Sequence, residues 1–317
     1  MKIKLLKNRS DIGAGTRGSD MGIDAVEIAA INAGNDYFHR HVYMDIVSHN
    51  ETIYRKNTNE FAKRIEHVLE QCIRVSEAVE QTFNYGFFPL VISGDHSSAL
   101  GTISGIKAAN PDKTLGVIWL DAHADIHSPY TSPSGNIHGM PLAAALNLDN
   151  LECQINEPSA ITLSHWSALK NVGIEGPKLL PKHLLYFGLR DYEKAEEELI
   201  HREHIKYFQV KELRFNSLRD SIEDAIELLK ECDHIYISFD VDSMDCDKIS
   251  YGTGTPVKIG FHPQEIMSII DMFIDTGKVS CIEFCEINPL LDNKGNKMAE
   301  TAFSVLDHIS RKIESIA

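Results

Sequence analysis

Short runs of apolar residues alternate along the chain with longer segments in which apolar residues recur every three or four positions. The runs are typical of strands buried on both faces, and the periodic segments are typical of amphipathic helices. We predict strands at residues 2–6, 88–93, 115–120, 184–188, 206–210, 234–239 and 279–285. We predict helices at residues 20–33, 58–85, 97–109, 139–147, 193–202, 216–231, 263–276 and 297–314. The alternation favours one α/β domain over residues 1–317, with a central parallel sheet and helices on both of its faces.

Three of the predicted strands end directly in aspartate or histidine. The run at 115–120 is followed by Asp121, His123 and Asp125, and side chains at every second position of an extended chain point the same way. Two more aspartates end the run at 234–239, and a histidine follows the run at 88–93. Parallel sheets bind ligands beyond the carboxyl ends of their strands. We therefore take six residues as candidate metal ligands: His96, Asp121, His123, Asp125, Asp240 and Asp242.

Taken singly, each of these residues has an ordinary alternative role, since aspartate commonly caps helices and forms turns. Taken together, four carboxylates in one pocket would repel each other and take up protons unless cations neutralised them. Two divalent cations would balance the formal charge of the four carboxylates. A ligand set rich in oxygen, with some imidazole and no cysteine, favours manganese over zinc.

Composition narrows the classes of partner. The chain has 31 Lys and Arg against 46 Asp and Glu, a net charge of −15, which argues against a nucleic-acid partner because phosphates attract basic surfaces. No apolar run approaches the roughly 20 residues of a membrane span, and the apolar stretch at the start is too short for a signal peptide. The six cysteines contain no CxxC pair and are expected to be reduced. We therefore expect a cytoplasmic protein that acts on a small molecule, without a membrane or nucleic-acid partner.

Gly13, Gly15 and Gly18 match the GxGxxG pattern of dinucleotide-binding loops. That fingerprint requires a strand that runs straight into the glycines, but the polar residues 7–11 separate the two here. No second strand ending in an acidic residue follows at the distance that ribose recognition requires. We interpret the segment as a loop in which glycine permits positive φ and close approach of backbones.

Several motifs resemble the ureohydrolase superfamily. They are Ser93-Gly-Asp-His-Ser97, Asp121-Ala-His-Ala-Asp125, Ser134-Gly-Asn-Ile-His-Gly139, Ser238-Phe-Asp-Val-Asp242, Gly254-Thr-Pro256 and Glu286-Ile-Asn-Pro289. They occur in matched order over residues 85–290, and the third and last are similar to the motifs of arginases rather than agmatinases. The resemblance implies a three-layer αβα fold with about eight strands. It also implies a homo-oligomer, a trimer or a hexamer.

At the site, the resemblance implies hydrolysis of L-arginine to L-ornithine and urea by a hydroxide that bridges two Mn²⁺ ions per chain. One ion would be held by His96, Asp121, Asp125 and Asp240, and the other by Asp121, His123, Asp240 and Asp242.

Four residues, one of them the candidate ligand Asp125, take catalytic or pocket-lining roles under the same resemblance. Asp125 would also accept a hydrogen bond from the hydroxide. Glu286 would pair with the guanidinium, because a planar cation and a carboxylate match in charge and shape. His138 would act as an acid or proton shuttle, since its ordinary pKa lies near working pH. Thr255 would help to line the pocket.

Two of the residues that would bind the α-substituents of the substrate depart from the family pattern. Ser134 and Asn136 would hydrogen-bond the substrate carboxylate, and Glu196 would read the α-ammonium. His127 stands where arginases carry an asparagine that contacts the carboxylate, and Glu193 stands where they carry an aspartate. These two departures keep a second hypothesis open, that the chain is another ureohydrolase such as an agmatinase, guanidinobutyrase or formiminoglutamase.

A third hypothesis is a non-catalytic member of the superfamily that binds a regulatory ligand or partner. The presence of Glu286 and His138 argues against it. Both residues also have ordinary readings, since Glu286 could be a plain strand-end carboxylate and His138 could cap the helix that follows.

Overall fold

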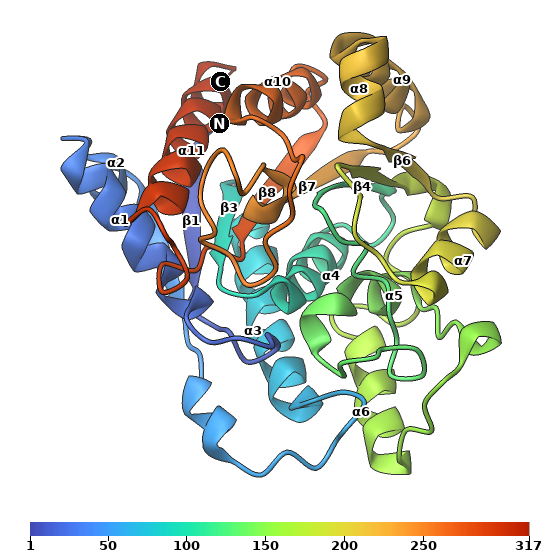
Figure 1. Cartoon of the computed structure of the whole chain (residues 1–317). Coiled ribbons are helices and arrows are strands. Elements are labelled where there is room, and N and C mark those ends of the chain that lie inside the picture. Colours follow the sequence, from blue (N-terminus) through green and yellow to red (C-terminus); the bar gives the residue numbers. More distant parts are fainter. Residues whose placement is uncertain (317) are drawn as a thin grey trace.

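The computed structural model describes residues 1–316, and its centre is a sheet of eight parallel strands. The strands are β1 (Ile3–Asn8), β2 (Val42–Ile46), β3 (Phe88–Ser93), β4 (Leu115–Leu120), β5 (Leu184–Phe187), β6 (Lys206–Phe208), β7 (His234–Asp240) and β8 (Val279–Cys285). Their order across the sheet is β2-β1-β3-β8-β7-β4-β5-β6, and every pairing is parallel (Figure 1). The predicted parallel α/β sheet is confirmed.

Helices cover both faces of this sheet, as predicted. One face is covered by α1 (Gly22–Asn32), α2 (Tyr37–Arg40), α8 (Val210–Asn216), α9 (Leu218–Leu228), α10 (Pro263–Ile274) and α11 (Lys297–Ser315). The other is covered by α3 (Ile65–Asn84), α4 (Ala99–Ala109), α5 (Pro141–Leu146), α6 (Ala160–Lys170) and α7 (Lys194–Arg202). Each layer buries its own hydrophobic cluster against the sheet, so the arrangement is three-layered.

Two predicted boundaries were wrong because local hydrogen bonds override the apolar pattern. The helix predicted at 58–85 begins only at Ile65, since Arg64 has left-handed backbone (φ 58°). The side chain of Asn57 accepts hydrogen bonds from the backbone N–H groups of Asn59 and Arg64 and closes a turn there. Such Asx turns compete with helical hydrogen bonding.

The helix predicted at 216–231 corresponds to α9, which begins at Leu218. It is preceded by α8, a helix that was not predicted and that begins at Val210, inside the strand predicted at 206–210. Ser217 lies between them in extended backbone, and its hydroxyl accepts a hydrogen bond from the N–H of Asp220. Serine at this position is a favoured N-cap, so it starts α9 and ends α8. Strand β2 was missed altogether, because it is an edge strand with mostly exposed side chains.

The order of the strands creates a crevice. From β3 the chain passes to β4 and leaves a gap in the sheet, which β8 and β7 fill later. The carboxyl ends of β3, β8, β7 and β4 therefore lie side by side where the winding of the sheet reverses, the position at which open α/β sheets bind ligands. Within residues 1–316, no helix is both long enough and apolar enough to cross a membrane.

Candidate metal and substrate site

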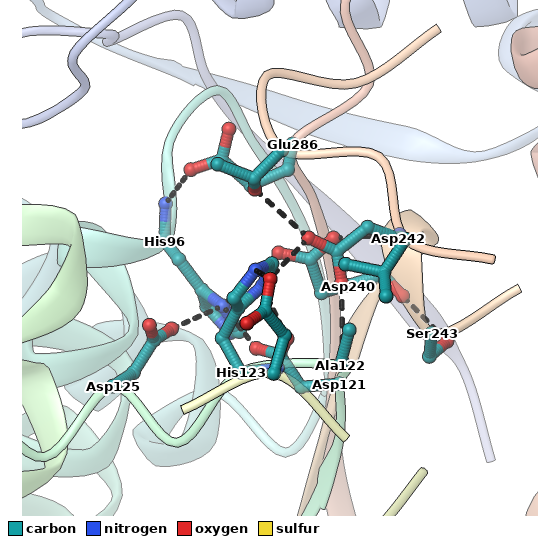
Figure 2. A network of polar contacts seen from close by, with 12 residues as sticks. His96, Asp121, Ala122, His123, Asp125, Asp240, Asp242, Ser243 and Glu286 are labelled. Carbon is teal, nitrogen blue, oxygen red and sulfur yellow. Dashed lines mark hydrogen bonds and ion pairs between the residues drawn. The ribbon is translucent and has the colours of Figure 1, made fainter. Parts of the chain in front are cut away.

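The ends of β3, β4 and β7 bring all six candidate ligands together (Figure 2). His96 lies in the turn after β3. Asp121 follows β4, and Asp240 is the last residue of β7. Two groups of potential ligand atoms lie within 4.8 Å of one another: His96, Asp121 and Asp125 form one, and Asp121, His123 and Asp242 form the other. Asp121 belongs to both groups, whereas Asp240 lies close to His96 of the first group.

The first group has the geometry of a cation site. His96 Nδ1 lies 3.1 Å from Asp121 Oδ2, 3.0 Å from Asp125 Oδ2 and 3.3 Å from Asp240 Oδ2. Nevertheless, Nδ1 and Asp121 Oδ2 are buried atoms without a hydrogen-bond partner among the described residues. Buried polar atoms are rarely left unpaired, so unpaired atoms that face one point fit the donor set of a cation site.

The ring of His96 is fixed on its other sides. Its Nε2 lies 2.7 Å from Ser238 Oγ, and the ring stacks on Trp119 with centroids 4.0 Å apart. A histidine that ligates a metal through one nitrogen commonly holds a polar partner with the other. Nδ1 is therefore the nitrogen that points into the group of carboxylates.

The second group is built in the same way. His123 Nδ1 lies 3.0 Å from Asp242 Oδ2 and 3.4 Å from Asp121 Oδ1. Asp242 is oriented by the Ala122 N–H, which donates to its Oδ1 at 3.2 Å, and by the Thr255 hydroxyl, which donates to its Oδ2 at 3.1 Å. Thr255 thus supports a ligand besides lining the pocket.

The charges of these groups conflict when no cation is present. Burial raises the pKa of Asp240, and the charges of Asp242 and Asp121 raise it further. Burial and the charge of Asp121 raise the pKa of Asp125 to about 6. These directions agree with the mutual repulsion expected of crowded carboxylates, although the contacts with His123 and His96 lower the pKa of Asp121. Cations would remove the conflict, so the donor set of carboxylates and imidazoles fits divalent metal ions.

Two of the site residues have backbone conformations that favour glycine. Asp125 has φ 48° and Glu286 has φ 62°. The left-handed region is uncommon for residues other than glycine, asparagine and aspartate, and such residues cluster at functional sites. The conformation turns both carboxylates off the strand ends into the site.

Glu286, which is buried, and His138, which is half-buried, form a pair beside the candidate metal ligands. His138 Nδ1 lies 3.3 Å from Glu286 Oε1, and the same oxygen accepts a hydrogen bond from the His96 N–H at 2.9 Å. Burial alone would raise the pKa of Glu286, but the hydrogen bond and charge of His138 outweigh it and hold that pKa below its usual value. Burial would lower the pKa of His138, and the contact with Glu286 raises it instead. The contact therefore favours the ionised form of Glu286 and the protonated form of His138.

The glycine-rich loop that contains Gly13, Gly15 and Gly18 supports this pair. Its interpretation as a loop in which glycine permits positive φ and close approach is confirmed. Gly13 donates its N–H to Asp95, and its carbonyl accepts a hydrogen bond from the His138 N–H at 3.2 Å. A Cβ on Gly13 would lie 2.4 Å from Ser97 Oγ, so the close approach requires glycine. Gly18 has φ 118°.

A cavity of about 310 Å³ opens over the metal-ligand groups. All the predicted substrate-binding residues line it: Ser134, Asn136, His127, Glu193, Glu196 and Thr255. His138 and Asp125 line it as well, whereas Glu286 is buried and is not part of the lining surface. Sequence analysis missed two polar lining residues, Ser132 and Asp191. Asp191 directly follows Arg190 in the loop after β5, so a strand-end search extended to β5 finds it.

We call the part of the cavity lined by the predicted substrate-binding residues its outer wall. It contains a histidine, His127, that is held between two side chains. His127 Nδ1 lies 3.0 Å from Thr131 Oγ1, and His127 Nε2 lies 3.0 Å from Glu193 Oε2. The hydrogen bonds with His127 and Glu196 lower the pKa of Glu193 to about 2. Burial raises the pKa of Glu196 well above its usual value. Both ring nitrogens of His127 are therefore already engaged within the protein.

Glu193 and Glu196 also begin helix α7. Each carboxylate accepts a hydrogen bond from the backbone of the other residue, which is a capping box. Glu196 Oε1 accepts a further bond from the Ile126 N–H at 3.2 Å. The start of α7 is thereby tied to the loop that carries Asp125 and His127.

Sequence analysis missed two other residues at the site. Cys285, which comes directly before Glu286, places Sγ 4.0 Å from Asp240 Oδ2, although no cysteine was expected near the ligands. Arg190 lies half-buried and donates to the carbonyl oxygens of Gly188, Asp242, Val257 and Lys258 at 2.7–3.1 Å. Arg190 stands in the motif Gly-Leu-Arg-Asp after β5, and only the fold shows which carbonyls it reaches.

Comparison with known proteins agrees with this architecture. The sequence model of the arginase family matches residues 2–310. The arginase of Bacillus caldovelox is 33% identical over 300 residues, which is 93% of each chain, and that of Bacillus subtilis is 33% identical over 304 residues, 95% of each chain. The crystal structure of the Bacillus caldovelox arginase superposes with a TM-score of 0.83 at 32% identity over 97% of both chains.

A more distant structure shares the fold alone. Formimidoylglutamase from Bacillus subtilis superposes with a TM-score of 0.74 at 18% identity, over 99% of this chain and 88% of that one. The match to the family sequence model and the identity to arginases over nearly the whole length are much stronger relations. The chain therefore belongs to the arginase family and is a hydrolase of that family.

Proposed function

We propose that this protein is a manganese-dependent arginase that hydrolyses L-arginine to L-ornithine and urea. The observation that carries the proposal is the pair formed by buried Glu286 and half-buried His138, with 3.3 Å between Nδ1 and Oε1, directly beside two groups of carboxylates and imidazoles. A guanidinium needs an ionised carboxylate to hold it and a proton donor for its leaving nitrogen, and this pair supplies both. The arginases of Bacillus caldovelox and Bacillus subtilis support the same choice of substrate.

We assign two manganese ions to the six candidate ligands. His96, Asp121, Asp125 and Asp240 would hold one, and Asp121, His123, Asp240 and Asp242 the other. The predominance of carboxylate oxygen supports manganese. When bound, two such cations lower the pKa of a shared water molecule and so supply a nucleophile near neutral pH.

The chain's own residues orient the substrate and move the proton. Glu286 uses Oε1 for His96 and His138, which leaves Oε2 to accept from the guanidinium. Asp125 accepts a hydrogen bond from the attacking water. His138 gives a proton to the departing nitrogen, because its contact with Glu286 raises the pKa of the imidazole and so favours its protonated form.

The outer wall binds the α-substituents of the substrate. Ser134 and Asn136 donate to the carboxylate, while Glu193 and Glu196 face the α-ammonium. His127 holds Glu193 in position instead of reading the carboxylate itself, since both of its ring nitrogens are engaged. Thr255 keeps Asp242 oriented.

One set of assays tests the proposal. Urea release is measured from L-arginine, agmatine and guanidinobutyrate with manganese present, and we expect arginine to give the highest kcat/KM. Urea from agmatine or guanidinobutyrate but not from arginine would favour another ureohydrolase. Metal analysis that finds no ion bound at saturating manganese would favour a non-catalytic family member.

We further propose that residues 1–317 form one catalytic domain of a cytoplasmic homo-oligomer, a trimer or a hexamer. A single sheet that includes residues from Ile3 to Cys285 supports the one domain. All six cysteines are free, as expected in a reducing compartment. Light scattering of the purified protein measures the oligomeric state.

A further inference from the structure

A buried thiol adjoins the metal centre. Cys285 ends β8 and pairs in register with Asp240, the last residue of β7. Its Sγ lies 3.8 Å from the carbonyl oxygen of Phe239 and 4.0 Å from Asp240 Oδ2. Together with His96 and Asp240 it forms a third group whose potential ligand atoms all lie within 4.8 Å of one another.

The distances suit one ion of the soft or borderline class. Metal–sulfur and metal–oxygen bonds of zinc are about 2.3 Å and about 2.0 Å long, so one ion can span at most about 4.3 Å between the two atoms. The 4.0 Å between Cys285 Sγ and Asp240 Oδ2 falls within this reach. His96 Nδ1, a buried atom without a hydrogen-bond partner in the described chain, supplies an independent sign that this space takes a ligand.

We propose that Cys285 is a latent thiolate ligand, which joins His96 and Asp240 when a soft divalent cation such as Cd²⁺ or Zn²⁺ replaces manganese. The inference rests on the ligand roles given to His96 and Asp240 in the proposed function. When such a cation binds, the S–H bond breaks, a sulfur–metal bond forms and the proton passes to solvent. Manganese, which prefers oxygen ligands, leaves the thiol protonated.

A second cysteine on the same strand provides a matched control. Cys281 lies four residues earlier on β8, so its side chain leaves the same face of the sheet, and it is equally buried. It packs in the hydrophobic cluster beneath the α3 layer and belongs to none of the ligand groups in residues 1–316. The two thiols therefore differ in their distance from the ligands and not in burial.

The test is a titration of the metal-free protein with Cd²⁺, followed by the ultraviolet charge-transfer absorption that a cadmium–thiolate bond gives and that carboxylate or imidazole ligands do not. Cys153 is the one cysteine that is not buried, so every protein carries Cys153→Ser. We expect a band that saturates at one Cd²⁺ per chain, is lost in Cys285→Ser and Cys285→Ala, and is retained in Cys281→Ser. Cys285→Ser should weaken Cd²⁺ binding about tenfold or more while leaving the affinity for Mn²⁺ within about twofold.

A band that persists in Cys285→Ser, or Cd²⁺ affinity equal to that of the parent protein, would overturn the inference. The two Cys285 variants are first compared with the parent by thermal melting, so that loss of the fold is not read as loss of the ligand. Failure of the proposed function has a different signature: the parent protein then binds no Mn²⁺ or releases no urea from arginine. A parent that binds Mn²⁺ and hydrolyses arginine, but gives no band with Cd²⁺, contradicts the thiolate inference alone.

Discussion

The inner and outer ends of the cavity are built in different ways. At the inner end, Asp121 and Asp240 are almost fully buried and stand at the ends of paired strands. At the outer end, the side chain of Glu193 is 58% exposed and stands at a helix start that follows a loop. Parallel pairing fixes the inner side chains, whereas the outer ones depend on loops that vary freely. Under the proposed function, the metal ligands at the inner end are thus positioned by the sheet, and the residues that select the substrate at the outer end are positioned by loops.

Removing a ligand at the inner end should have the largest effect. In Asp240→Ala we expect loss of bound manganese and a fall in kcat of roughly a thousandfold or more, since the nucleophile depends on the ions. Metal content per chain and urea release measure both effects. Asp247→Ala, which removes an exposed acid from the following loop, serves as the control and should change neither. Two ions still bound to Asp240→Ala would contradict the ligand assignment.

Removing the proton donor should lower the rate without emptying the site. In His138→Asn we expect kcat to fall about 10²- to 10⁴-fold, the usual contribution of a general acid. Manganese content should stay at the wild-type value, because His138 contacts Glu286 and none of the assigned ligands. Loss of metal together with activity would show that His138 acts through the metal site.

Proton release should accompany metal binding at the inner end. Burial would lower the pKa values of His96 and His123, but the neighbouring carboxylates raise both well above the usual value in the metal-free protein. These contacts favour the protonated form of both imidazoles, and a cation that binds them must displace a proton from each protonated ring. For each displaced proton, we expect manganese affinity to fall by up to about tenfold when the pH is lowered by one unit. The affinity should rise when the pH is raised.

Calorimetry in two buffers of different ionisation enthalpy counts the protons released. His123→Asn should release fewer than the wild type. Binding that is independent of both buffer and pH would rule out this protonation state.

A change at the outer end should shift selectivity with a smaller effect on rate. His127→Asn restores the residue that arginases carry, and we expect it to raise the ratio of kcat/KM for arginine over agmatine about tenfold, by one added hydrogen bond to the carboxylate. Thr131→Val removes the partner of Nδ1, together with the acceptor of the Ser128 N–H, and leaves the contact between His127 and Glu193, so it should hold the ratio near the wild-type value. An unchanged ratio in His127→Asn would show that an asparagine at position 127 does not reach the substrate carboxylate.

The same contrast explains what could be predicted from sequence. Continuous apolar runs that lead into Asp121 and Asp240 predicted both the strands and the candidate ligands, because a buried parallel strand has one register and one open end. Strand β2 escaped prediction because its exposed edge position leaves little apolar pattern.

At the site, the limits of prediction have a similar cause. The engagement of both ring nitrogens of His127 depends on Thr131 and on Glu193, which lies 66 residues further along the chain. The proximity of Cys285 to Asp240 depends on the pairing of β7 with β8, strands that are far apart in sequence. Neither contact leaves a local signal in the residues around it.

Arg190 holds the two ends of the segment from Asp242 to Lys258 together by hydrogen bonds. Its guanidinium holds the carbonyl of Asp242 at one end of this segment and those of Val257 and Lys258 at the other. A chain segment whose ends are pinned together can change length between them at little entropic cost, because loop closure depends only weakly on length. Insertions and deletions between the pinned carbonyls can therefore remodel the mouth of the cavity over evolution while Asp242 keeps its place.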